Sequence, residues 1–219
     1  MPTTEILVAP LTAGSDIGDP DNAAAVVMKE VGDRLAATAG VQQIYFGTWV
    51  ESPDTFQLLV NWDKMDSHKA FIATEVYQPF LQRFLTMTAG APRMIHADMQ
   101  PESEFSRAVA APVTEVATFY FDGEAPADYL EGVEKFRQVI EKDGADGYLG
   151  ACVGSTYEDD NEREGVKGQA AVVLIGWESV DKHMAFRETS SFKDNIKWLR
   201  NGAQKIEMHH VQFMEFVAG

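Results

Sequence analysis

Apolar residues follow two alternating periods along the chain, and the periods come in the same order in both halves. Runs of strand length, rich in β-branched and aromatic residues, are separated by stripes at the i, i+3, i+4, i+7 spacing of amphipathic helices. Strands are expected at 6–9, 43–50, 56–62 and 93–99, and again at 116–121, 148–157, 170–177 and 205–216. With a helix after the first and third strand of each set, each half predicts β-α-β-β-α-β, the ferredoxin-like order.

The clearest internal repeat surrounds a tryptophan that ends the third strand of each half. Residues 62–74 and 177–189 share six identities in thirteen positions, offset by 115 residues (177 − 62), and each set follows an apolar run. The matching pairs are Trp62 and Trp177, Asp66 and Asp181, His68 and His183, Ala70 and Ala185, Phe71 and Phe186, and Thr74 and Thr189. This pattern indicates two copies of one module.

The third strands are almost continuously apolar, which is typical of strands that are covered on both faces. The helices of one module cover only one face of its sheet, so the sister module is the expected cover for the other face. We therefore predict an α+β fold of two ferredoxin-like (βαββαβ) repeats that form an intramolecular dimeric α+β barrel with a cavity between the sheets. The expected boundaries are 1–100 and 114–219, joined by a linker over 101–113, although the alanines there also suit a short helix.

The charge and the single cysteine narrow the classes of function. The chain has 18 basic and 34 acidic residues, a net charge of −16, which repels nucleic acid and anionic lipid. Cys152 is the only cysteine, so an internal disulfide or a cysteine-rich zinc site is excluded, and a reducing, cytoplasmic location is expected. Neither a signal peptide nor an apolar run of membrane-spanning length is present. Phosphate-binding loops and dinucleotide motifs are also absent, so no cofactor is expected.

The apolar strand that ends in Trp62 or Trp177, the acidic helix start after it, and the His-x-x-Phe-x-x-Thr run resemble the dimeric α+β barrel superfamily, in particular the antibiotic-biosynthesis-monooxygenase (ABM) type of domain. The resemblance covers residues 5–99 and 115–216. It implies cofactor-free oxygenases, haem-degrading enzymes, polyketide cyclases, isomerases or stress-induced proteins as the classes of function to consider. A tandem copy resembles proteins of secondary metabolism.

Two branches of the superfamily are disfavoured by residues that depart from their patterns. Haem-degrading members carry a tryptophan where Phe71 and Phe186 stand, and a histidine near the positions of Leu81 and Ile196. Olivetolic acid cyclase carries a tyrosine at the former positions, and a histidine where this chain has Tyr77 and Phe192. Neither set of roles transfers residue by residue.

His68 and His183 are the candidate catalytic residues, because a histidine can take a proton from a phenol or an activated carbon near neutral pH. Each lies three positions before Phe71 or Phe186 and is expected on the same helix face. The alternative is that a histidine kept in both copies bonds the backbone and only stabilises the fold. His96 and the pair His209-His210 are further candidates, and at most one member of that pair faces the cavity because neighbours on a strand alternate. The alternative for each of these three is a surface or rim histidine.

Aromatic residues supply the expected walls of a cavity for a flat substrate. The counterparts of Tyr45 and Trp49 in the second half are Cys152 and Thr156, so one half is expected to hold the working pocket. The expected substrate-binding residues are Tyr45, Trp49, Phe71, Tyr77, Tyr120, Phe186 and His209. No metal site is expected, because no acidic residue lies at ligand spacing beside His183 and the 209–210 pair.

The leading hypothesis is a cofactor-independent enzyme that abstracts a proton from an aromatic or polyketide-like small molecule, leading to oxygenation, cyclisation, isomerisation or elimination. The alternative is a non-catalytic barrel protein that binds an apolar ligand or acts in a stress response. A homodimer of the tandem chain stays open. The sequence does not decide the substrate, the reaction or the active half.

Overall fold

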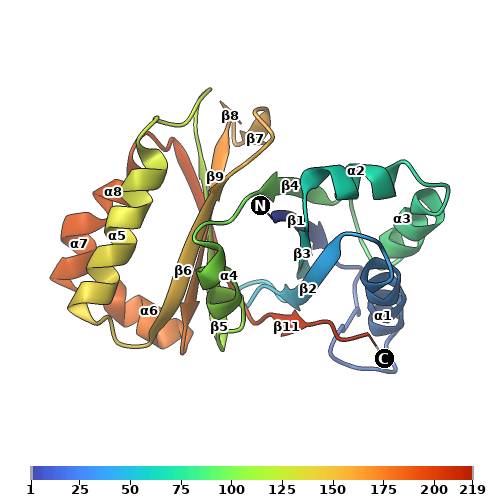
Figure 1. Cartoon of the computed structure of the whole chain (residues 1–219). Helices are drawn as coiled ribbons and strands as arrows, with labels where there is room; N and C mark the ends of the chain where they lie inside the picture. Colours follow the sequence, from blue (N-terminus) through green and yellow to red (C-terminus); the bar gives the residue numbers. More distant parts are fainter. Residues whose placement is uncertain (1, 219) are drawn as a thin grey trace. The chain divides into compact units, whose positions relative to one another are not determined.

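A computed structural model describes residues 2–218, which divide into two compact units. Unit 1 comprises residues 2–96 and 214–218, and unit 2 comprises residues 97–213. Both units combine helices with an antiparallel sheet (Figure 1).

In unit 1 the strand order is β11-β2-β3-β1-β4. The strands are β1 (Thr3–Pro10), β2 (Val41–Thr48), β3 (Thr55–Trp62), β4 (Arg93–Ala97) and the short β11 (Met214–Glu215), and the helices are α1 (Ala23–Ala36), α2 (Met65–Ile72) and α3 (Tyr77–Leu85). The helices lie on one side of this sheet (Figure 1). Alternate residues of β3, from Phe56 to Trp62, join their core.

Helix α1 shows why the sequence folds in this way. The side chain of Asn22 accepts a hydrogen bond from the backbone N–H of Ala24 and so caps the helix start. The apolar stripe is buried against the sheet, as its spacing predicts, and it consists of Ala24, Val27, Met28, Val31 and Leu35. Burial of each large side chain in such a stripe stabilises the fold by about 1.5–3 kcal/mol.

In unit 2 the strand order is β10-β5-β9-β6. The strands are β5 (Val113–Tyr120), β6 (Tyr148–Ser155), β9 (Ala170–Trp177) and β10 (Lys205–Val211), and the helices on one face are α5 (Tyr129–Asp143), α6 (Val180–Arg187), α7 (Ser190–Asn195) and α8 (Lys197–Arg200). When the strands are numbered within each repeat, they lie side by side in both units in the order fourth, first, third, second. The prediction of an α+β fold with two ferredoxin-like repeats is confirmed.

The expected linker contains a helix, α4 (Glu102–Val109), which packs on the face of the unit 2 sheet opposite to α5–α8. The Thr114 hydroxyl donates to the carbonyl oxygen of Ala108 at 2.8 Å. Gly176 allows the close approach, because a Cβ there would lie 2.8 Å from the Cβ of Ala111. Phe105, Ala108 and Val109 are buried at helical spacing, so this segment forms the short helix that its alanines suit.

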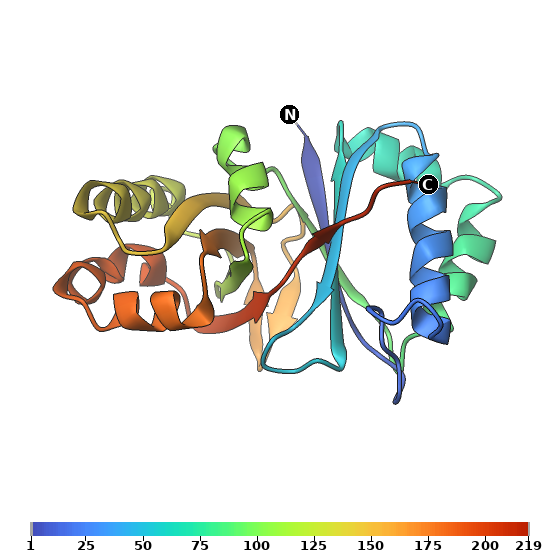
Figure 2. The same cartoon turned by 90° about the horizontal axis from the view of Figure 1, so that it is seen from below.

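The last expected strand, 205–216, is also divided. β10 ends at Val211, and the chain then adds β11 to the edge of β2 in unit 1 (Figure 2). Phe216 packs on α1 at Gly32, where a Cβ would lie 2.3 Å from the phenylalanine ring. The charged loop after β6 forms a hairpin of β7 (Asn161–Arg163) and β8 (Val166–Gly168). The predicted cavity between the repeats stays a prediction.

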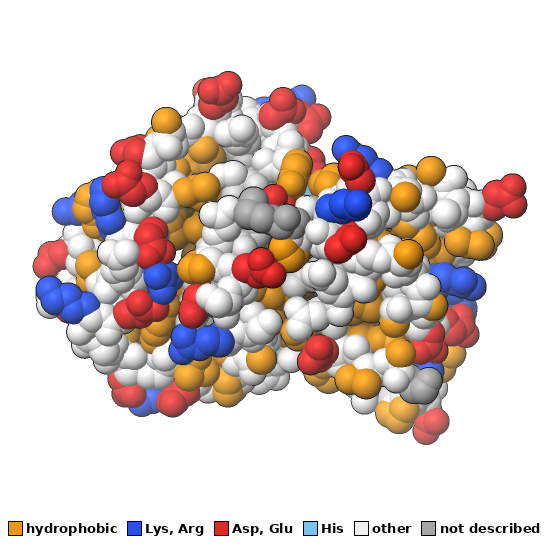
Figure 3. Space-filling model, viewed as in Figure 1, with side chains coloured by type: hydrophobic (Ala, Val, Ile, Leu, Met, Phe, Trp, Pro, Cys, Tyr) orange, Lys and Arg blue, Asp and Glu red, His pale blue; other side chains and the backbone are white. Residues whose placement is uncertain are grey.

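Acidic and basic side chains are interspersed over the face seen in Figure 3. Within residues 2–218, no helix has both the length and the apolar character needed to cross a membrane.

Candidate functional site

Each unit contains the same cluster of four buried side chains, on the helix-covered side of its sheet. Cluster 1 consists of Glu5, Trp62, His68 and His96, and cluster 2 consists of Glu115, Trp177, His183 and His210. In each cluster the glutamate comes from the first strand of the repeat, the tryptophan ends the third strand, one histidine lies on the following helix, and the other lies on the last long strand. All eight side chains are buried.

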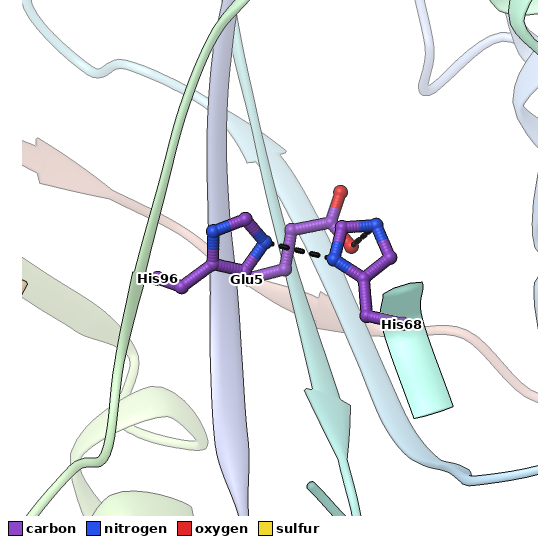
Figure 4. A group of neighbouring side chains, drawn as sticks. All are labelled: Glu5, His68 and His96. Atoms are coloured by element: carbon purple, nitrogen blue, oxygen red, sulfur yellow. Dashed lines mark hydrogen bonds and ion pairs between the residues drawn. The ribbon is translucent and has the colours of Figure 1, made fainter. Parts of the chain in front are cut away.

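The side chains of cluster 1 form a chain of close polar contacts (Figure 4). Nδ1 of His68 lies 2.8 Å from Nε2 of His96, and Nε2 of His68 lies 3.5 Å from Oε2 of Glu5. The indole N–H of Trp62 donates to the same Oε2 at 3.0 Å. The ring of Trp62 also stacks on His68, with centroids 4.8 Å apart.

Cluster 2 repeats this geometry almost atom for atom. Nδ1 of His183 lies 2.7 Å from Nε2 of His210, and Nε2 of His183 lies 3.2 Å from Oε2 of Glu115. The indole N–H of Trp177 donates to Oε2 of Glu115 at 3.2 Å, and its ring stacks on His183 at 5.2 Å. The repeat found in the sequence is therefore a repeat of a polar site.

Local structure explains how cluster 2 is assembled. Glu115 on β5 pairs directly with His210 on β10, so both side chains emerge on the same face of the sheet. The Ser179 hydroxyl accepts a hydrogen bond from the backbone N–H of Lys182 and caps α6. This cap fixes the first turn of the helix. His183 lies in that turn, and its ring stacks on the ring of Trp177.

The two histidines of each cluster share one proton along their short contact, because a hydrogen bond needs one donor and one acceptor. Two proton arrangements satisfy cluster 2. In one, His210 donates to His183 and His183 donates to an ionised Glu115. In the other, a protonated Glu115 donates to His183 and His183 donates to His210. Going from the first to the second takes the proton from Nε2 of His210, so a proton must be added at its Nδ1 for the imidazole to stay neutral. With that added proton, the three side chains can pass a proton from His210 to Glu115.

Burial sets the acidity of the glutamates. It raises the pKa of the Glu115 carboxyl to about 7, although the Trp177 hydrogen bond and the charge of Arg187 oppose the shift. Burial likewise raises the pKa of Glu5, against the Trp62 hydrogen bond and the charge of His96. Because its pKa is near neutral, Glu115 can both accept and release a proton under physiological conditions.

Cluster 1 also meets a geometric test for a metal site, since ligand atoms of Glu5, His68 and His96 all lie within 4.8 Å of one another. The contact between the two histidine nitrogens is 2.8 Å. Two imidazole ligands on a tetrahedral zinc ion lie about 3.3 Å apart, given Zn–N bonds of about 2.0–2.1 Å. The shorter contact fits a shared proton better than a shared ion, so the polar chemistry of this cluster is hydrogen bonding.

Cluster 2 lies at the wall of a cavity inside unit 2. The cavity has a volume of about 70 Å³ and is partly open to solvent, because its lining includes the exposed Arg200 and Ile206. Its polar wall includes Glu115 and His183, with Arg187 and Arg200 also lining it. The remaining lining is apolar and comprises Ala117, Phe119, Phe136, Ile175, Trp177, Phe186, Phe192, Ile196, Leu199, Ile206 and Met208.

The structure brings only part of the predicted site together. His183 and Phe186 line the cavity of unit 2. Phe71 and Tyr77 pack edge to face in the core of unit 1, with centroids 5.4 Å apart, and Phe71 also contacts Trp62. His68 is the counterpart of His183 in cluster 1.

The other four predicted substrate-binding residues belong to the sheet faces opposite the clusters. Trp49 follows β2 and donates its indole N–H to Gln57 at 3.0 Å. Tyr120 donates its hydroxyl to Glu207, a strand neighbour of the helix-facing Met208. Tyr45 and His209 are likewise neighbours of the helix-facing Ile44 and His210. His210, not His209, is the member of the pair that joins the cluster.

Sequence reasoning missed the two glutamates and the two arginines. A signal for the glutamates was present, because each is a charged residue within an otherwise apolar first strand and follows a threonine: Thr4-Glu5-Ile6 and Thr114-Glu115-Val116. The arginines gave no such signal, since helix ends carry basic residues in many proteins.

No protein-family model and no curated protein sequence matches the chain. Similarity is found among solved structures. An anthrone oxidase-like protein aligns over 100% of this chain and 94% of its own, with a TM-score of 0.74 and 14% sequence identity. A proposed monooxygenase from Fusobacterium nucleatum aligns over 100% and 95%, with a TM-score of 0.61 and 13% identity. A second, from Lactobacillus acidophilus, aligns over 100% and 97%, with a TM-score of 0.55 and 13% identity.

Identities at this level establish the fold and leave the activity to be argued from the site. The matches extend over the whole chain, so they cover both repeats. Each repeat has the ferredoxin-like strand order. The chain therefore shares with these solved structures an α+β fold, which here consists of two ferredoxin-like repeats.

Proposed function

We propose that the cavity of unit 2 is the active site of a cytoplasmic, cofactor-independent enzyme that removes a proton from an aromatic or polyketide-like small molecule. The observation that carries this proposal is the position of Glu115 and His183, which form a buried proton chain at the wall of an aromatic-lined cavity. Aromatic walls suit a flat substrate, and a base beside it needs no cofactor to act.

The contacts of cluster 2 favour Glu115 as the group that first receives the proton. Both ring nitrogens of His183 are engaged, one toward His210 and one toward Glu115. The contacts of Trp177 and His183 with the glutamate both fall on Oε2, and among residues 2–218 no hydrogen bond to its Oε1 is found. Oε1 is therefore the available acceptor, with His183 positioning the carboxylate and exchanging protons with it.

The proposed step breaks a C–H or O–H bond of the substrate. The proton goes to Glu115, and the electron pair stays on the substrate as an enolate or phenolate. That anion is the common intermediate for oxygenation by dioxygen, cyclisation, isomerisation or elimination. Fold similarity to an anthrone oxidase-like protein makes anthrones the first compounds to test, and polyketides of secondary metabolism the next.

The test compares the two clusters, since each variant in unit 2 has a matched control in unit 1. Product formation from anthrone-type and polyketide substrates is measured for Glu115→Gln and His183→Ala, and for Glu5→Gln and His68→Ala. We expect the unit 2 variants to lose about a hundredfold or more of activity, as is typical of a lost general base, and folded unit 1 variants to keep it. Full activity of Glu115→Gln would remove the carboxyl from the mechanism.

The rival proposal, an apolar-ligand carrier without turnover, is supported by the presence of cluster 1. A four-residue cluster kept in both repeats fits a role in stabilising the fold. Tight binding of the same compounds without any product, measured by calorimetry, would favour this rival.

A further inference from the structure

The cavity of unit 2 carries two cations at its wall in a strongly acidic protein. The chain as a whole has a net charge of −16. The segment 180–205, from the start of α6 to the first residue of β10, contains six basic and three acidic residues, a net charge of +3. The equivalent segment of the first repeat, 65–90, contains two of each and is neutral. The positive charge therefore belongs to the repeat that contains the cavity beside cluster 2.

Three of the six basic residues in this segment are neutralised by nearby carboxylates. Lys182 pairs with Asp146, Lys193 with Glu188, and Lys205 with Glu164. Within residues 2–218, no ion pair of Arg187 or Arg200 is found. Each of these arginines is the last residue of its helix, α6 or α8, and both line the cavity.

Arg187 is held in place by the cavity wall. Its guanidinium carbon lies 5.9 Å from the centroid of the Phe192 ring, and this ring also lines the cavity. The side chain is half-buried, and its charge reaches cluster 2, since it lowers the pKa of Glu115. An arginine oriented in this way over an aromatic ring can also donate to a carboxylate through two N–H groups.

The first repeat lacks both cations at the corresponding positions. With the offset of 115 residues, Arg187 corresponds to Ile72 and Arg200 to Leu85. Ala117 is the second residue after Glu115, and the second residue after Glu5 is Leu7. The larger side chain of Leu7 packs into the core of unit 1. A small residue at the cavity wall and two cations beside it therefore distinguish unit 2 from its copy.

We propose that the cavity of unit 2 selects an aromatic ligand that carries a carboxylate, with the ring between the apolar walls and the carboxylate on Arg187 and Arg200. This inference names the substrate class of the proposed active site and rests on that proposal. A carboxylate at the arginines leaves the acidic C–H or O–H at the other end of the ring for Glu115. The second repeat, and not the first, is then the ligand-binding half.

The experiment measures the dissociation constants of 4-hydroxybenzoate and 4-hydroxybenzamide by calorimetry at pH 7.5. The two compounds have the same ring and phenol and differ in the charge of one substituent. We expect the carboxylate to bind about tenfold or more tightly than the amide, because hydrogen bonds to charged groups contribute about 1.5–3 kcal/mol and each 1.4 kcal/mol is tenfold.

Three variants locate the selectivity. Arg187→Gln is expected to remove most of the carboxylate preference, while leaving amide binding within about twofold. Lys197→Gln is the matched control, since Lys197 is an exposed cation on α8 that does not line the cavity. Ala117→Leu introduces the side chain that unit 1 carries and is expected to block both ligands, with thermal unfolding as the check that the protein is folded.

Equal affinity for the two compounds would overturn the inference, as would no binding of either compound. If Lys197→Gln and Arg187→Gln reduced the preference for the carboxylate equally, the inference would also be overturned, because the selectivity would then come from the overall positive charge of the helices. Product formation that survives Glu115→Gln would refute the catalytic proposal without changing the ratio of the two dissociation constants. The two failures are thus distinguishable.

Discussion

Replacing Glu115 by glutamine should change how the stability of the protein depends on pH. Burial raises the pKa of this carboxyl from 4.5 to about 7 in the folded protein. Below about pH 4.5 the carboxyl is protonated in the folded and the unfolded state, so it contributes no pH dependence. Between pH 4.5 and 7 the folded state holds more protons than the unfolded state, so the free energy of unfolding falls as the pH rises.

The size of the effect follows from the shift. Each pKa unit corresponds to about 1.4 kcal/mol, so the folded protein loses about 3 kcal/mol of stability from this one group by pH 7 and above. Glutamine removes the titration and keeps the geometry. The contacts of Trp177 and His183 both fall on Oε2 of Glu115, and the amide oxygen of glutamine can accept both.

The assay is urea unfolding of the wild type and of Glu115→Gln from pH 5 to pH 8. We expect the variant to be less sensitive to pH across this range, and to gain up to about 3 kcal/mol relative to the wild type at pH 8. Glu102→Gln is the control, because Glu102 is an exposed glutamate of α4 outside both clusters and its replacement changes the net charge equally. The reasoning is refuted if Glu115→Gln and Glu102→Gln show the same pH dependence.

Three further predictions concern single residues. Trp177→Phe removes the hydrogen bond that opposes the rise in the pKa of Glu115. The same urea series should then show the fall in the free energy of unfolding extending to higher pH. An unchanged pH range for this fall would contradict the prediction. Gly32→Ala would stabilise an ordinary helix by about 1 kcal/mol, but here the added Cβ would lie 2.3 Å from the Phe216 ring. We therefore expect faster hydrogen exchange of the backbone amides over 214–216. Unchanged exchange would contradict the packing of Phe216 on α1. Burial raises the pKa of the Cys152 thiol, so a thiol reagent should label it only after unfolding in urea, and rapid labelling of the native protein would show that the thiol is accessible.

Much of the fold could be predicted because it depends on periodicity. The apolar stripes of α1 and α5 and the continuous apolar run of β9 specify which faces are buried, and their order specifies the ferredoxin-like repeat. Helix α4 was only the alternative to a linker, because its buried stripe, Phe105, Ala108 and Val109, is short and lies among charged residues. The division of the last strand was missed because nothing local to 212–216 shows that its partner is β2, far away in the sequence.

The candidate site could be predicted only in part. The repeat identified His68 and His183 by their spacing from the tryptophans, and the alternation of a strand reduced His209-His210 to a choice of one. His210 is the histidine that joins the cluster, because it pairs with Glu115 on the neighbouring strand. The sequence gives no information about the register between these two strands. For the same reason the glutamates, which complete the proton chains, were not recognised.

By itself, the sequence determined the duplicated module, its order of elements and the histidine that each copy repeats, because these features depend on local spacing and side-chain type. The tertiary structure decided which strand neighbours meet, and so assembled a glutamate, a tryptophan and two histidines into one buried chain in each unit. It also placed Arg187 and Arg200 at a cavity in the second repeat. Such proximity is a property of packing between distant segments, and no local pattern encodes it.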